Sequence, residues 1–299
     1  MTRRQFLATG TAAALASGAT SGMYVALNAS LTGGKSPWPD LVALAAETGY
    51  AGCDLSLAGA MKEGVAATRA LYAKTGLRPS FCSLPVTATR DEAAFSSTLG
   101  ALEEAARFAA AVDCPRMMAV MPASSQTPKA EFRRILLDRF SAVAEVLRRH
   151  NVRLGLEFLG PLHFRKANPH EFIWRLDEML PFSIECGPNV GVVLDNWHWH
   201  HSGGTVGDIE AVEKSRVVLL HLSDCAKLAP EDVRDNQRLL PGEGVIDLMG
   251  FFGALKKIGY EGSVSPEPIG RIPKEVSAAQ GAKLGLESTL AVMRKAGVS

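Results

Sequence analysis

The chain has 299 residues, of which 47% are hydrophobic and 21% are charged, and its formal net charge is +1. This composition is ordinary for a folded globular protein, and the length fits one large α/β barrel or two smaller domains. Because the sequence lacks the basic excess of proteins that bind nucleic acid or anionic membranes, we expect neither partner and favour a small neutral or weakly charged ligand.

The first 22 residues have the features of an export signal. Arg3 and Arg4 precede Phe6 and Leu7, and a weakly apolar stretch rich in Ala, Gly and Thr follows. This pattern is typical of twin-arginine signals. We therefore expect residues 1–22 to be a signal segment that directs a folded domain, residues 23–299, to the periplasm. A translation start at Met23 is the alternative, and it would leave the protein in the cytoplasm.

The rest of the chain carries neither a membrane anchor nor a disulfide pattern. No later stretch approaches the roughly 18 to 20 apolar residues of a spanning helix, so we expect no stable membrane insertion. The cysteines are odd in number, widely separated and without a Cys-x-x-Cys pair, which favours buried free thiols. They are Cys53, Cys82, Cys114, Cys186 and Cys225.

From residue 23 onward, a strand-like segment followed by a helix-like segment occurs eight times. The predicted strands are 24–31, 52–57, 78–84, 116–121, 153–158, 190–195, 217–222 and 262–267. Helical spacing is found at 41–47, 93–112, 132–150, 169–180 and 248–258. Gly49, Gly76 and Gly259 are predicted helix stops.

Strands that alternate with helices pair in parallel through right-handed crossovers, and eight such units close into a (β/α)8 TIM barrel. No low-complexity linker divides the segment 23–299. The alternative is an open doubly wound sheet, which usually has a Gly-rich phosphate turn after its first strand. Gly33 and Gly34 are too short a match to that turn, so we predict the barrel.

Four of the predicted strands, the fifth to the eighth, end in a residue that can bind a metal. These residues are Glu157, Asp195, His221 and Glu267. In a barrel, side chains of inward parity at the C-terminal strand ends meet in one cavity. Counting back by twos gives small or apolar residues that would fill the interior: Gly155, Gly191, Val193, Val217, Leu219, Ser263 and Ser265.

Three carboxylates that face one another repel and raise one another's pKa unless a cation lies among them. The sequence therefore predicts one divalent metal held by Glu157, Asp195, His221 and Glu267. Three oxygen donors with one imidazole favour Mn²⁺, with Co²⁺, Mg²⁺ and Zn²⁺ as alternatives.

Several longer motifs resemble one known family. They are Leu-Glu-Phe-Leu-Gly-Pro at 156–161, Asn-Val-Gly-Val-Val-Leu-Asp-Asn-Trp-His at 189–198, Leu-His-Leu-Ser-Asp at 220–224, Arg-Leu-Leu-Pro-Gly-Glu-Gly at 238–244, and Pro-Glu at 266–267. Together they resemble the xylose isomerase-like TIM barrels, also called sugar phosphate isomerase/epimerases, which include tagatose and psicose 3-epimerases and inosose dehydratase. The resemblance covers residues 24–296.

The resemblance also implies roles for individual residues. It makes Glu157, Asp195, His221 and Glu267 the metal ligands, and His198 and Arg238 substrate contacts. In family members that epimerise or isomerise, glutamates in the positions of Glu157 and Glu267 exchange protons with the substrate from opposite faces. A cation at Arg238 can hold a substrate oxygen anion, and Trp197 is a candidate wall for a sugar ring.

The expected reaction is isomerisation or epimerisation of a ketose-like sugar or polyol. A metal that chelates a carbonyl and a neighbouring hydroxyl stabilises an enediolate after a carboxylate removes the adjacent proton. Expulsion of a β-hydroxyl from that enediolate gives a lyase or dehydratase instead, acting on a keto-sugar, keto-glycoside or inosose. The second alternative is a non-catalytic carbohydrate-binding or accessory subunit, and association into homo-oligomers stays open.

One further alternative is a DNA-repair nuclease. Endonuclease IV, a DNA-repair enzyme of the same superfamily, needs histidines on earlier strands and an Asp-x-His pair after its seventh, and this chain lacks both. We interpret His163, His200 and His201 as loop or rim residues, and Glu243 as a residue that fixes its loop. Asp54 and Asp224 either orient metal ligands or cap helices and turns.

Overall fold

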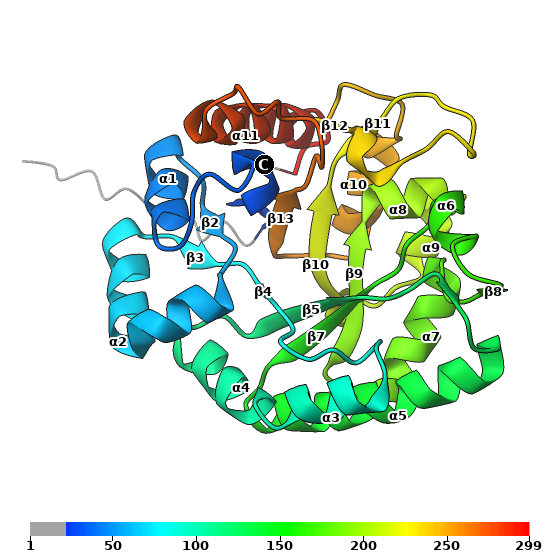
Figure 1. Ribbon diagram of the computed structural model, residues 1–299. Helices are drawn as coiled ribbons and strands as arrows, with labels where there is room; N and C mark the ends of the chain where they lie inside the picture. Colours follow the sequence, from blue (N-terminus) through cyan, green and yellow to red (C-terminus); the bar gives the residue numbers. More distant parts are fainter. Residues whose placement is uncertain (1–21, 299) are drawn as a thin grey trace, which may run out of the picture.

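The computed structural model describes residues 22–298, so the predicted export signal lies outside the described residues apart from its last position. Strands form the centre and helices surround them (Figure 1). The strands of the main sheet are β1 (Tyr24–Leu27), β2 (Gly52–Cys53), β3 (Arg78–Pro79), β4 (Cys82–Ser83), β5 (Arg116–Val120), β7 (Arg153–Glu157), β9 (Val190–Asp195), β10 (Val217–Leu222) and β13 (Ser263–Pro266). This is the predicted α/β barrel.

The sheet closes through one interrupted segment. Its strand order is β3-β2-β1-β13-β10-β9-β7-β5-β4, and every neighbouring pair is parallel. The two edge strands, β3 and β4, belong to one predicted strand that is broken at Ser80 and Phe81. Because β3 pairs with β2 and β4 pairs with β5, these two short strands together occupy one position of the barrel. The nine strands therefore fill the eight strand positions of a TIM barrel.

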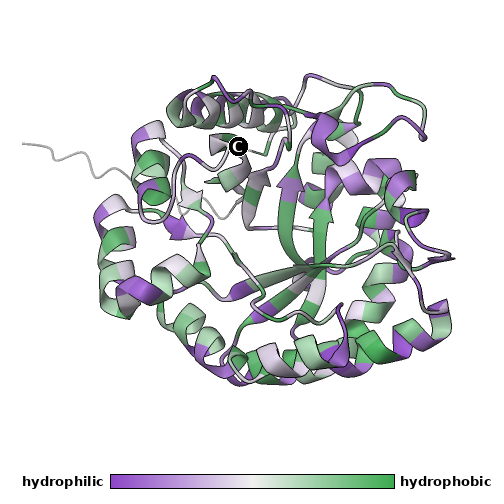
Figure 2. Ribbon diagram, viewed as in Figure 1, coloured by the Kyte–Doolittle hydropathy of each residue, from purple (hydrophilic) through white to green (hydrophobic). Residues whose placement is uncertain are grey.

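The outer ring consists of helices that pack their apolar faces against the strands. They are α1 (Asp40–Thr48), α2 (Leu57–Thr75), α3 (Glu92–Leu99), α4 (Leu102–Ala111), α5 (Lys129–Arg149), α7 (Leu176–Cys186), α10 (Leu248–Lys257) and α11 (Ala278–Lys295). In Figure 2 the central strands β9 and β10 are mostly hydrophobic, whereas hydrophilic residues gather on helices and loops. None of the described helices is long and apolar enough to cross a membrane.

Several short elements lie between these strands and helices. They are the helices α6 (Leu162–Arg165), α8 (Asn196–His201) and α9 (Val206–Glu210), the 3₁₀ helices η1 (Ala29–Thr32), η2 (Lys214–Arg216) and η3 (Asp235–Gln237), and the antiparallel pairs β6 (Ser124–Ser125) with β8 (His170–Glu171) and β11 (Asp224–Cys225) with β12 (Arg238–Leu239).

Five predicted strands agree with the structure to within one residue at each end, and three are corrected. The first, 24–31, ends at Leu27, because the Asn28 side chain accepts from the Ser30 N–H and caps η1. The second, 52–57, has only two residues in the strand, and Leu57 already begins α2. The third, 78–84, is split into β3 and β4.

Two predicted helices are also corrected. The segment 93–112 forms two helices, α3 and α4, with Gly100 between them, since glycine disfavours the helix interior. The segment 169–180 begins as β8, because Phe172 N–H donates to the Ala123 carbonyl beside the β6–β8 pair, and α7 starts only at Leu176. The predicted stops at Gly49 and Gly76 are confirmed, since both adopt positive φ, 94° and 70°.

The inward-facing positions pack as the period of two predicts. Phe81, Met118, Val193 and Leu219 form their own buried cluster, separate from the core between strands and helices. Gly155 lies beside this cluster, and a Cβ there would be 2.8 Å from a methyl group of Val193. This closely packed interior supports the side chains at the strand ends. The five cysteines are buried and unpaired within residues 22–298, as predicted.

Candidate metal centre

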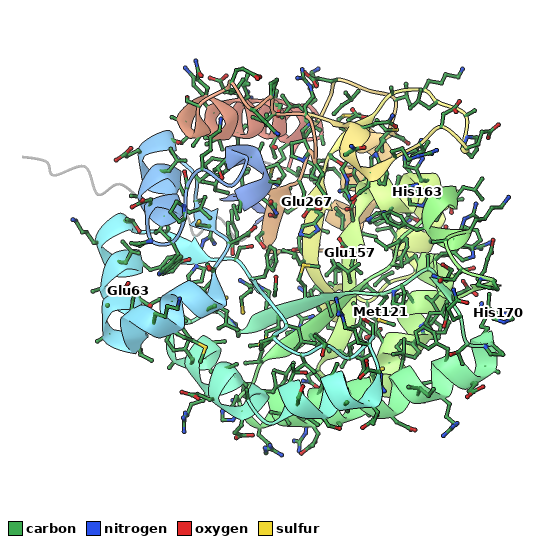
Figure 3. All side chains as sticks on the ribbon, viewed as in Figure 1. Glu63, Met121, Glu157, His163, His170 and Glu267 are labelled. Atoms are coloured by element: carbon green, nitrogen blue, oxygen red, sulfur yellow. The ribbon has the colours of Figure 1, made fainter. Side chains whose placement is uncertain are left out.

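Four side chains converge at the C-terminal end of the barrel. Glu157 ends β7, Asp195 ends β9, His221 belongs to β10, and Glu267 directly follows β13. These strands are neighbours in the sheet. Each residue offers one ligand atom, and the four atoms all lie within 4.8 Å of one another. Glu157 and Glu267 lie near the middle of the ring of helices (Figure 3). The structure thus brings the four predicted ligands together.

Burial and mutual repulsion determine the charges at this centre. Glu157, Asp195 and His221 are at most 4% exposed. The His221 Nδ1 atom donates to Glu157 Oε1 at 2.7 Å and lies 3.5 Å from Glu267 Oε2. Burial, against the opposing effect of His221, raises the pKa of Glu157 to about 7. Burial alone would lower the pKa of His221, but the carboxylates, Glu267 first, raise it to about 10.

This donor set fits a divalent cation. Three carboxylates and one imidazole, largely buried and within a few ångströms of one another, are hard to maintain without positive charge among them. Oxygen donors with one nitrogen suit manganese, cobalt, magnesium and zinc. The residues that would hold the ion are therefore Glu157, Asp195, His221 and Glu267.

Metal uptake is expected to release a proton. Below a pKa of about 10, His221 is protonated in the metal-free protein, and a metal ligand must be neutral imidazole. Between pH 8 and 9, above the pKa of Glu157 (about 7) and below that of His221, the apparent affinity for Mn²⁺ should therefore rise roughly tenfold per pH unit, because one proton is displaced. Calorimetric titration in two buffers of different ionisation enthalpy measures that proton directly. An affinity that is independent of pH and of buffer would contradict the assignment of His221.

Arg238 is the cation that already neutralises part of this cluster. Its Nη1 atom donates to Asp195 Oδ2 at 2.7 Å and to Glu267 Oε2 at 3.1 Å. Its Nε and Nη2 atoms donate to Asp235 Oδ1 at 3.0 and 2.8 Å. Burial raises the pKa of Asp195, but Arg238, His198 and His221 together outweigh burial, and the net pKa of this carboxyl lies below its usual value. Arg238 is 2% exposed, so the ion pairs form in a largely dry site.

His198 and Trp197 pack around this arginine. His198 Nε2 accepts from Arg238 Nη2 at 3.2 Å, and burial lowers the pKa of His198 to about 3, so its ring is neutral. The Trp197 ring is 4.7 Å from the Arg238 guanidinium carbon. Trp197 is 1% exposed, so a buried ring packs against the guanidinium group. Its role as a wall for a sugar ring stays a prediction.

Asp224 holds the loop that carries Arg238. Its Oδ2 atom accepts from the N–H groups of Gly242 and Gly244, and its Oδ1 atom accepts from those of Cys225 and Ile246. One buried carboxylate therefore ties residues 242–246 to the end of β10. Glu243 fixes the same loop through the Leu240 N–H and a bidentate pair with Arg271, as the sequence interpretation proposed.

Replacing Asp224 with alanine is expected to loosen this loop. Hydrogen bonds to charged groups contribute about 1.5–3 kcal/mol each and are not additive, so we expect the local opening free energy to fall by about 3 kcal/mol. Hydrogen exchange of the Gly242, Gly244 and Ile246 amides measures the change. Asp247→Ala, which removes a cap from the Gly250 N–H at the start of α10, is the control and should leave those amides protected.

The other strand ends contribute a buried polar chain that the sequence indicated only in part. Asn28 Nδ2 donates to Ser265 Oγ at 3.2 Å, and Ser265 Oγ donates to Asp54 Oδ2 at 3.2 Å. Burial raises the pKa of Asp54 well above its usual value. Asp54 was a candidate for orienting ligands, whereas Asn28 and Asp235 were missed. Asn28 carries the same signal that identified the four proposed metal ligands, which is a polar residue at the end of an apolar strand.

The chain is similar to proteins of one known family. A family model described as xylose isomerase-like TIM barrel matches residues 42–294. The solved structure of a xylose isomerase domain protein from Alicyclobacillus acidocaldarius is 30% identical, superposes with a TM-score of 0.84, and covers 92% of this chain and 99% of its own. The IolI protein, solved with a zinc atom, is 19% identical, with a TM-score of 0.78 and coverage of 91% and 99%.

Two curated relatives are similar in sequence. An inosose isomerase of Halalkalibacterium halodurans is 26% identical over 208 residues, which are 69% of this chain and 71% of the relative. A 3-dehydroshikimate dehydratase of Pseudomonas putida is 25% identical over 158 residues, which are 52% of this chain and 24% of that protein.

Proposed function

Because this chain belongs to the xylose isomerase-like TIM barrel family, we propose that it is a divalent-metal-dependent isomerase or epimerase of a ketose-like sugar or polyol. The observation that carries the proposal is the convergence of two glutamates and one aspartate on a single buried imidazole. A purely structural cluster would not need three carboxylates in one closely packed site.

The residues present can perform both halves of a proton transfer. A bound divalent ion would polarise a substrate carbonyl and acidify the neighbouring C–H group. Glu157 and Glu267 end strands on either side of the β9–β10 pair, so they approach the centre from different directions. A glutamate carboxylate beside the acidified C–H group can both take and return a proton. Burial raises the pKa of Glu157 to about 7 in the metal-free protein, and a bound cation would lower it again.

Arg238 and His198 complete the proposed substrate site. Arg238 presents a permanent positive charge beside Asp195 and Glu267, where it can stabilise negative charge on a substrate oxygen. His198 is neutral, and Arg238 donates to its Nε2 atom, so Nδ1 is left to donate a hydrogen bond to a substrate hydroxyl group. The inosose isomerase relative supports a polyol ketone as the substrate class.

The second candidate is a lyase or dehydratase, and the 3-dehydroshikimate dehydratase relative favours it. The same proton abstraction next to a carbonyl would begin that reaction. The outcome then depends on whether a β-hydroxyl leaves before the proton is returned.

Proton NMR in D₂O tests both proposals. The Mn²⁺-loaded enzyme is incubated with inososes, ketoses and keto-glycosides, and the metal is removed before spectra are recorded. Deuterium incorporation with formation of an epimer or isomer supports the isomerase and identifies the carbon. Incorporation with loss of water or of a leaving group supports the lyase. If no compound exchanges, the non-catalytic binding role is favoured instead.

Zinc bound by the IolI protein supports a divalent metal, and manganese is our proposal for this chain. Activity after reconstitution of chelated protein with Mn²⁺, Co²⁺, Mg²⁺ or Zn²⁺ ranks the four ions. The highest turnover with Mn²⁺ is the expected result.

We also propose that residues 1–22 direct export to the periplasm through the twin-arginine route. Lysine at both Arg3 and Arg4 is expected to leave the protein in the cytoplasm, because that route recognises the paired arginines. Cell fractionation measures the distribution, and Arg133→Lys with Arg134→Lys on α5 is the matched control. Equal periplasmic amounts of the two double variants would contradict the proposal.

A further inference from the structure

A cavity lies near the metal centre, and none of the four proposed metal ligands lines it. It has a volume of about 620 Å³ and is bounded by α6, α8 and the loop after β11. Figure 1 shows these three segments on the same side of the barrel. Trp197 connects the two sites, since its ring is 4.7 Å from the Arg238 guanidinium carbon and 4.4 Å from the ring of His201, which lines the cavity.

The cavity wall is positively charged. Arg165 and Lys227 line it, and no aspartate or glutamate does. Neither cation takes part in an ion pair within the described part of the chain. The Arg165 guanidinium carbon lies 3.9 Å from the centre of the Trp174 ring, which fixes the group in place. Two cations without carboxylate partners make this wall complementary to an anion.

The remaining lining is polar without charge, or apolar. His200 and His201 are neutral near pH 7, because burial lowers the pKa of both rings, and each can donate one hydrogen bond. Leu228 and Val245 line the same cavity and are 44% and 50% exposed, so they present apolar surface to a ligand. Such a surface is suited to a ligand that covers the apolar side chains and pairs with the cations.

We propose that this cavity binds a small organic anion, a carboxylate attached to an apolar ring. The ligand class differs from the polyol proposed for the metal centre, because the lining has no carboxylate or side-chain amide to accept hydrogen bonds from several hydroxyl groups. The carboxylate pairs with Arg165 and Lys227, and the ring covers Leu228 and Val245.

Calorimetric titration of the full-length, Mn²⁺-loaded protein with naphthalene-2-carboxylate and with naphthalene-2-carboxamide tests the proposal. The two probes have nearly the same shape and differ in charge. We expect saturable binding of one carboxylate per chain and at least tenfold weaker binding of the amide. Equal affinities, or no saturable binding, would overturn the proposal.

Variants assign the binding to this cavity. Arg165→Met is expected to weaken the carboxylate about tenfold, and Arg165→Lys to restore part of the loss. Arg175→Met is the matched control, since Arg175 also lies over the Trp174 ring, at 5.6 Å, but is paired with Asp177 and does not line the cavity. Unchanged affinity in Arg165→Met, with a native circular dichroism spectrum, would refute the site.

Removal of the metal separates this site from the metal centre. A carboxylate probe could bind the ion itself, so the titration is repeated after chelation. We expect the affinity to stay the same, because no proposed metal ligand lines the cavity. Loss of binding together with the metal would place the probe at the metal centre and overturn the inference, whichever reaction the enzyme catalyses.

Discussion

Glu157→Gln and Glu267→Gln are each expected to reduce turnover by about 10³-fold or more, while the protein stays folded. General acid–base catalysis contributes about 10² to 10⁴-fold, and each substitution also removes one charged metal ligand. Glutamine keeps the shape of the side chain, so the packing around it should change little. Kinetics of deuterium exchange from substrate measure the loss.

A metal determination and a control variant distinguish loss of catalysis from other effects of these substitutions. Metal content, determined by mass spectrometry of the purified variants, separates loss of the ion from loss of the proton carrier. Glu185→Gln is the matched control, since Glu185 is 47% exposed in its ion pair with Arg133 and lies outside the centre. Full activity in both Glu157→Gln and Glu267→Gln would remove the assigned acid and base.

Arg238→Met is expected to destabilise the metal-free protein by about 3–5 kcal/mol, since this is the typical cost of removing one partner from a buried ion pair. Arg238 is 2% exposed and contacts Asp195, which is 0% exposed, as well as Glu267 and Asp235. Methionine fills much of the volume but leaves these carboxylates without their cation. Urea denaturation in the presence of a chelator measures the free energy of unfolding.

The control is an arginine in a similar bidentate pair at the surface. Arg271 pairs with Glu243 through Nε and Nη2, and the two side chains are 38% and 36% exposed. Arg271→Met should cost less than about 1 kcal/mol, because exposed ion pairs contribute little. Adding Mn²⁺ should narrow the difference between the variants, since the ion neutralises some of the same carboxylates. Equal losses in the two variants without metal would contradict the proposed charge balance.

Some features could be predicted because they depend on local periodicity. Asp195 ends an uninterrupted apolar strand, and His221 lies at the same position of the next strand, where the register pairs the two residues. A period of two along parallel strands is enough to place both on one inward face. Predictions failed where local interactions override that period, as at Asn28, whose side chain caps a 3₁₀ turn and ends the first strand early.

The sequence by itself determined the barrel and which four side chains meet at its C-terminal end, since strand parity and residue chemistry are local properties of the chain. Only the tertiary structure decided that Arg238 contacts Asp195 and Glu267 and that the Trp197 ring packs against this arginine. It also showed that the third predicted strand is broken into β3 and β4. These contacts join segments far apart in the sequence, and their distances depend on how the sheet closes and how the loop held by Asp224 folds back over it. No periodicity along the chain encodes such distances.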